Sequence, residues 1–68
     1  MLACYAIDEE VEIKHAVDSL REELDAIKKY SQRIAMCASP ELKSIMKHNL
    51  KEEREHAMKL LVWLRTNS

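Results

Sequence analysis

The chain has 68 residues and a net charge of −1, which suffices for one small domain with a limited core. It contains no glycine and one proline, and its charge gives no basic surface for nucleic acid. No apolar run approaches the roughly 18 residues that a membrane span requires. This composition, rich in helix-forming residues, predicts a single all-α domain over residues 1–68, with neither nucleic acid nor a membrane as partner.

The first seven residues are mildly apolar, but they lack the basic region and the cleavage site of a signal peptide. The two cysteines, Cys4 and Cys37, have neither the paired spacing of a zinc site nor that of a redox motif. Reduced thiols are the ordinary state of such cysteines in a reducing compartment. We therefore expect a cytoplasmic protein.

The first predicted helix covers about residues 8–37. Asp8 is suited to cap its free amide groups, and the acidic residues that follow favour the positive end of the helix dipole. An alternating four-three spacing predicts one packing face, formed by Ile13, Val17, Leu20, Leu24, Ile27 and Ile34. At about 100° per residue, Glu23 falls inside this apolar face.

A turn is predicted at residues 38–40, before a second helix over about residues 41–65. Ser39 is a suitable N-cap, and Pro40 suits the first helical position because its missing amide would be unpaired there. With so short a connection, the two helices should run antiparallel as a hairpin.

The second helix carries a broad apolar arc with three polar members, Asn49, Glu53 and His56. The apolar members are Leu42, Ile45, Met46, Leu50, Ala57, Leu60, Leu61, Trp63 and Leu64. An unpaired charge within such an arc costs several kcal/mol, so Glu53 and His56 require compensation. The pattern Glu-x-x-His, facing inward from a bundle helix, is how di-iron carboxylate proteins present part of a metal site.

Counting outward from the turn places Glu23 at the level of Glu53 and His56. Glu23 lies about sixteen residues before the turn, and the other two lie about fourteen and sixteen residues after it. One hairpin thus supplies half of a di-iron ligand set, and a copy related by a twofold axis would complete a four-helix bundle. Four carboxylates would balance two ferrous ions in charge, and carboxylate oxygens with one imidazole per metal suit iron better than structural zinc.

Four stretches resemble the encapsulated ferritin family, namely residues 19–27, 40–42, 48–57 and 63–65. The resemblance implies that Glu23, Glu53 and His56 are ferroxidase ligands. It also implies metal-attracting carboxylates at Glu22 and Asp25, and a tyrosine beside the centre at Tyr30. This sequence departs from the family at Lys29, where a tryptophan usually stands.

The same resemblance implies the activity and the assembly. We expect a ferritin-like ferroxidase that oxidises Fe(II) with dioxygen or peroxide at a homodimer interface, with Ca, Zn or Mn able to substitute for iron. The implied assembly is a ring of dimers, a decamer as a rule, carried as cargo in an encapsulin shell that stores the iron.

Two other functions fit the residues. A rubrerythrin-like peroxide or oxygen reductase would keep its di-iron centre, although the chain has no rubredoxin-like cysteine pair. A metal-free helical oligomerisation module would use the carboxylates and His56 as a buried polar network. For Asn49, a hydrogen bond to a ligand and an interhelical hydrogen bond that fixes register are equally plausible. His15 and His48 are expected on the surface.

Overall fold

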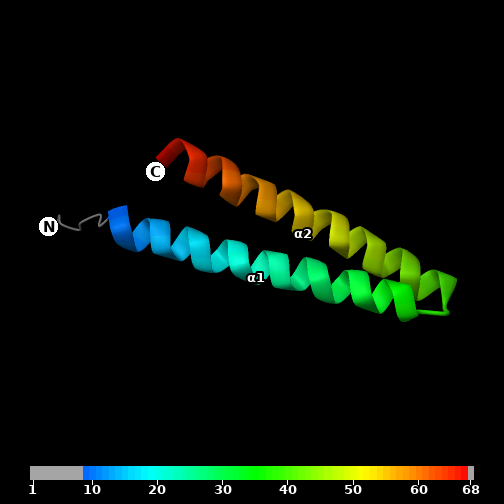
Figure 1. Ribbon diagram of the computed structural model, residues 1–68. Coiled ribbons are helices and arrows are strands. Elements are labelled where there is room, and N and C mark those ends of the chain that lie inside the picture. Colours follow the sequence, from blue (N-terminus) through cyan, green and yellow to red (C-terminus); the bar gives the residue numbers. More distant parts are fainter. Residues whose placement is uncertain (1–8, 68) are drawn as a thin grey trace, which may run out of the picture.

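The computed structural model describes residues 9–67 and folds them into two long α-helices joined by a short turn (Figure 1). Helix α1 spans Glu9–Met36 and helix α2 spans Pro40–Asn67. The helices run antiparallel, side by side, and every described residue outside them belongs to the turn. The predicted all-α hairpin is therefore confirmed.

The helix boundaries follow from local hydrogen bonds. The sequence predicted helices over about 8–37 and 41–65, whereas the second one begins at Pro40 and continues to Asn67. In its last turn, the Thr66 hydroxyl donates to the Val62 carbonyl and the Asn67 amide donates to the Trp63 carbonyl, at 2.9 and 2.8 Å. Both bonds return to the carbonyl four residues earlier in the same helix, so the side chains of the last turn fold back onto α2. The predicted cap Asp8 and the cysteine Cys4 lie outside the described residues.

Ser39 forms the expected cap of α2. Its hydroxyl accepts a hydrogen bond from the Leu42 amide at 3.2 Å, and its carbonyl accepts one from the Lys43 amide at 2.9 Å. The Cys37 thiol donates to the same carbonyl at 3.5 Å. The turn is thus defined by contacts within about seven residues of sequence, which explains why sequence alone could predict it.

The core between the helices is small. The buried residues of the described chain are Ala16, Met46, Leu50 and Ala57, which are 5 to 9% exposed. Other large apolar side chains of the predicted faces stay about half exposed, among them Leu24, Leu42, Ile45 and Leu61. One neighbouring helix covers only part of a broad apolar arc, so these residues remain uncovered in a lone hairpin. Neither α1 nor α2 is long and apolar enough to cross a membrane.

Candidate metal centre

Three potential ligands converge halfway along the hairpin. Glu23 projects from α1, while Glu53 and His56 project from α2 and share one side because they are three residues apart. One ligand atom from each residue lies within 4.8 Å of those of the other two. This is the set that the level count from the turn had placed together.

The His56 ring lies close to both carboxylates. Its Nδ1 atom is 3.3 Å from Glu23 Oε2 and 3.9 Å from Glu53 Oε1. The carboxylate side chains are 23% exposed, whereas the imidazole is 52% exposed. The cluster is therefore covered by the helix pair on one side and open to a partner or to solvent on the other.

The carboxylates are poorly compensated within one hairpin. Glu23 Oε2 is buried and accepts no hydrogen bond from any residue in the described range 9–67. The pKa of the Glu53 carboxyl is raised, first because hydrogen bonding with Glu23 favours its protonated form, and then through partial burial and repulsion from Glu23. The pair therefore favours a bound cation, either a proton or a metal ion.

The donor set fits iron. Two carboxylates and one imidazole are ligands that Fe(II) accepts, and three protein ligands leave coordination positions open for a further carboxylate, water or an oxidant. A divalent cation would also bind the Glu23 oxygen that lacks a hydrogen-bond partner. The three residues thus form a group that could hold a metal ion.

The predicted accessory carboxylates lie outside this cluster. Glu22 and Asp25 are exposed on the surface of α1. Asp25 pairs with Lys29 at 2.9 Å, and that hydrogen bond together with the positive charge of Lys29 lowers the pKa of Asp25. Within one hairpin, neither residue reaches the three ligands.

Tyr30 is also outside the three-ligand group and contacts Asn49 instead. The Asn49 Nδ2 atom donates to the Tyr30 hydroxyl at 3.3 Å, and the Arg33 guanidinium lies 5.9 Å from the centre of the tyrosine ring. The interhelical hydrogen bond considered for Asn49 is therefore present. His15 and His48 are exposed, and His48 lies 3.7 Å from Glu52.

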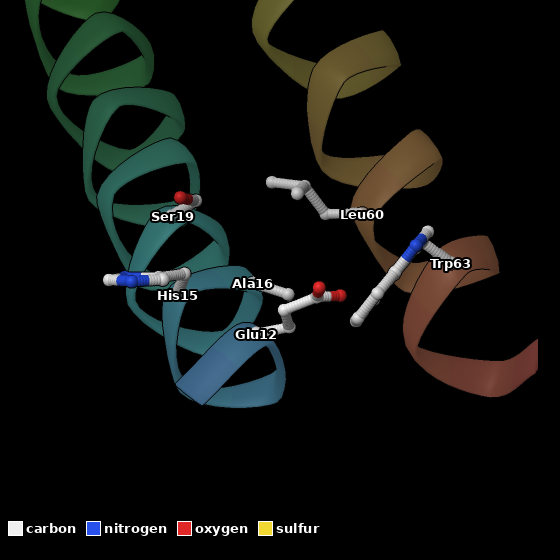
Figure 2. Close-up of a pocket in the computed structure, with 6 residues that line it drawn as sticks. All are labelled: Glu12, His15, Ala16, Ser19, Leu60 and Trp63. Carbon is white, nitrogen blue, oxygen red and sulfur yellow. The ribbon is translucent and has the colours of Figure 1, made fainter. Parts of the chain in front are cut away.

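A groove follows the cluster toward the open end of the hairpin, with a volume of about 360 Å³ (Figure 2). It is lined by Glu12, His15, Ala16, Ser19, Leu60 and Trp63. The Glu12 carboxylate points toward Trp63, whereas the His15 ring points away from α2 (Figure 2). Glu12 and His15 repeat the Glu-x-x-His spacing, but they do not converge as a ligand pair.

Sequence reasoning had not singled out Glu12. The sequence does indicate its place, since Glu12 lies eleven residues before Glu23. Eleven residues are about three helical turns, so the two carboxylates lie on the same side of α1. The groove and the metal cluster therefore occupy one continuous flank of the hairpin.

Comparison with known proteins places this geometry in a family. An encapsulated ferritin-like protein from Rhodospirillum rubrum is 45% identical over 60 residues, which cover 88% of this chain and 43% of that protein. A ferritin-like protein from Thermotoga maritima is 44% identical over 52 residues, covering 76% and 46% of the two chains. This chain thus spans less than half the length of both relatives.

The crystal structure of protein ne0167 from Nitrosomonas europaea has a similar fold. It matches with a TM-score of 0.85 and 44% identity, over 97% of this chain and 72% of that one. The EncFtn-like family model matches residues 5–68, nearly the whole sequence. The chain is a member of the EncFtn-like family.

Proposed function

We propose that this protein is a ferroxidase that oxidises Fe(II) to Fe(III) at a di-iron site shared by two copies of the chain. Membership of an encapsulated ferritin-like family supports an iron-related, ferritin-like function. The observation that carries the finer proposal is the convergence of Glu23, Glu53 and His56 around an unsatisfied, buried carboxylate oxygen.

Electrostatics argues for a paired site. The pKa of Glu53 is raised, first by hydrogen bonding with Glu23, then by partial burial and by repulsion from the Glu23 carboxylate, so the two glutamates of one hairpin do not both ionise without cost. A twofold copy without metal would bring two more carboxylates and increase that repulsion, whereas two ferrous ions would balance all four. Metal binding and dimerisation are therefore thermodynamically linked.

The flank around the cluster supports the same pairing. On the helical wheel of α2, Leu42 and Ile45 share the side of His56, and they are 49% and 53% exposed. The groove beside Leu60 and Trp63 continues this apolar surface beyond the cluster. A second hairpin would cover the apolar residues on both sides of the ligands and exclude water from the site.

In this mechanism the chain holds and orients its substrate ions. Glu23, Glu53 and the neutral imidazole of His56 bind Fe(II) and leave positions open for dioxygen or peroxide. Two ferrous ions give up one electron each to the oxidant. The exposed carboxylates of Glu22 and Asp25 attract iron to the site and accept it afterwards. A packed pair of hairpins has no cavity for a mineral, so we infer that an encapsulin shell, suggested by the name of the Rhodospirillum relative, stores the product.

The test is ferrous loading without oxygen, followed by elemental analysis and absorbance on adding air. Glu23→Ala, Glu53→Ala and His56→Ala should each reduce oxidation to the rate of free iron. Glu55→Ala is the matched control, since Glu55 is an exposed neighbour of His56 on the same helix. An unaltered rate in Glu53→Ala would refute the site, and iron retained through repeated cycles would indicate a resident oxygen-reductase centre instead.

A further inference from the structure

We propose that Asn49 and Tyr30 are positioning residues whose hydrogen bond across the two helices fixes their register and so places Glu23 opposite Glu53 and His56. The inference rests on the proposed metal site. It assigns these two residues a role distinct from ligation, because neither belongs to the converging group.

The bond lies between the turn and the cluster. Asn49 precedes Glu53 by four residues on α2, and Tyr30 follows Glu23 by seven on α1. At about 1.5 Å rise per residue, Asn49 lies about 6 Å from Glu53 along the axis of α2, and Tyr30 lies about 10 Å from Glu23 along the axis of α1. Both side chains are half-buried, and the Nδ2 to hydroxyl distance is 3.3 Å.

The apolar core alone cannot fix the register of the two helices. Its four buried side chains include two alanines, and apolar contact is non-directional. A slip of one residue moves a helix by about 1.5 Å, which leaves apolar surface largely covered but breaks a hydrogen bond. The same slip would change the 3.3 Å distance between Glu23 Oε2 and His56 Nδ1 by up to about 1.5 Å. A single polar pair at a helix interface is an effective determinant of register.

The turn fixes the separation of the two helices only at its own end. Glu53 lies about 20 Å along α2 from Pro40, so a change of about 4° in the interhelical angle moves it sideways, toward or away from α1, by about 1.5 Å. The hydrogen bond between Asn49 and Tyr30 constrains the helices about two-thirds of the way from the turn to the cluster on α2 and about halfway on α1. Near the open end, the groove of about 360 Å³ separates side chains of the two helices, so packing there is less complete (Figure 2).

Arg33 supports the tyrosine from one turn away. Its guanidinium lies 5.9 Å from the ring centre, within the range of a cation–π interaction. The ring is thereby held at the helix interface with its hydroxyl directed to Asn49. Since the hydroxyl accepts from Asn49, its own proton remains available for another acceptor.

The test compares Asn49→Ala, Tyr30→Phe and the double variant, using Co(II) as the metal probe. We expect each single variant to bind Co(II) about tenfold more weakly, with altered visible absorption bands. The Co(II) affinity of the double variant should be no lower than that of a single variant, because both substitutions remove the same hydrogen bond. Asn49→Asp should restore binding, because its carboxylate can accept a hydrogen bond from the Tyr30 hydroxyl. Asn67→Ala is the matched control, since the Asn67 side chain bonds within its own helix.

Circular dichroism establishes that each variant is helical. Nuclear Overhauser contacts between Asn49 and Tyr30 in the metal-free protein test the hydrogen bond independently of metal binding. Absence of these contacts, additive losses in the double variant, or unchanged Co(II) binding would each overturn the positioning role. If the wild type shows the contacts but binds no Co(II), the metal site itself is refuted, and with it both the proposed function and this role.

Discussion

At the scale of single residues, the cluster lowers the stability of the chain when no cation is bound. Glu23 and Glu53 lie close together, and one Glu23 oxygen is buried without a hydrogen bond from the described residues. Such an arrangement is unfavourable until a cation arrives, because two neighbouring carboxylates cannot both ionise without cost. A structural polar network would instead satisfy each of its members.

Glu53→Gln should stabilise the metal-free protein at neutral pH and abolish metal binding. The pKa of Glu53 is raised above its ordinary value of 4.5, so its protonated form is favoured by folding. This contribution is fully present below pH 4.5 and is lost as the pH rises through the folded-state pKa. The wild type should therefore lose stability relative to Glu53→Gln between acid and neutral pH. Urea unfolding at several pH values measures this difference.

Glu55→Gln is the control for that titration, because Glu55 lies on the exposed side of the same helix. If Glu53→Gln and Glu55→Gln show the same stability relative to the wild type across the pH range, the repulsion between Glu23 and Glu53 is not significant.

Glu22→Ala should slow iron oxidation without changing how much iron binds. Glu22 is exposed and outside the cluster, so in the proposed function it would act on iron that approaches or leaves the site. We expect a two- to tenfold lower initial rate at low salt, with a smaller effect at high salt, as for electrostatic steering. Asp25→Ala should have a weaker effect, since Lys29 already pairs with that carboxylate. Stopped-flow absorbance and iron titration distinguish rate from stoichiometry, and a reduced iron stoichiometry would make Glu22 a ligand. Glu41→Ala, near the turn, is the control.

At the scale of the helices, the hairpin depends on the start of α2. Ser39 caps the helix and Pro40 occupies its first position. The cap and the three-residue connection together make the two helices antiparallel neighbours, so chain length brings Glu23 and Glu53 to within about one helical turn of the same level.

Ser39→Ala should destabilise the protein by about 1 kcal/mol, because the Leu42 amide loses its acceptor. Ser39→Asp should retain most of the stability, since aspartate is an equally good cap. Thermal or urea unfolding measures both variants against the wild type. Equal stability of Ser39→Ala and the wild type would mean that water replaces the cap.

At the scale of the whole molecule, the hairpin exposes more apolar surface than one chain can cover. Ile45 and Leu42 are exposed on the flank of the cluster, whereas Met58 and Val62 are exposed on other sides of α2. Contiguous exposed apolar surface is typical of an interface. The pattern favours an assembly in which two copies of the chain meet through the side that carries Leu42, Ile45 and the cluster.

Ile45→Lys should weaken metal-induced dimerisation by about tenfold or more, because the ammonium group would be buried without a partner. The three ligands themselves are unchanged, so any effect on the site acts through pairing. Sedimentation velocity with and without Co(II) measures the dimer.

Met58→Lys is the matched control, since Met58 is 60% exposed and Ile45 is 53% exposed on the same helix. It should leave the metal-induced dimer intact. A dimer lost in Met58→Lys but retained in Ile45→Lys would place the interface on the opposite flank.

The amino-acid sequence by itself determined the helices, the turn and the three residues that meet halfway along the hairpin. Glu53 and His56 share a side because they are three residues apart, and the short turn places Glu23 at their level. These are local properties of a helical repeat and a tight connection, so periodicity and counting suffice to predict them.

Tertiary structure alone decided which side chains meet across the helices. The contact of Asn49 with Tyr30, rather than with a ligand, depends on how both helices are rotated about their axes. The half-exposed state of Leu24, Ile45 and Leu61 likewise depends on how much of each apolar arc the neighbouring helix covers. Rotation and coverage arise from the packing of distant segments, which no local repeat encodes.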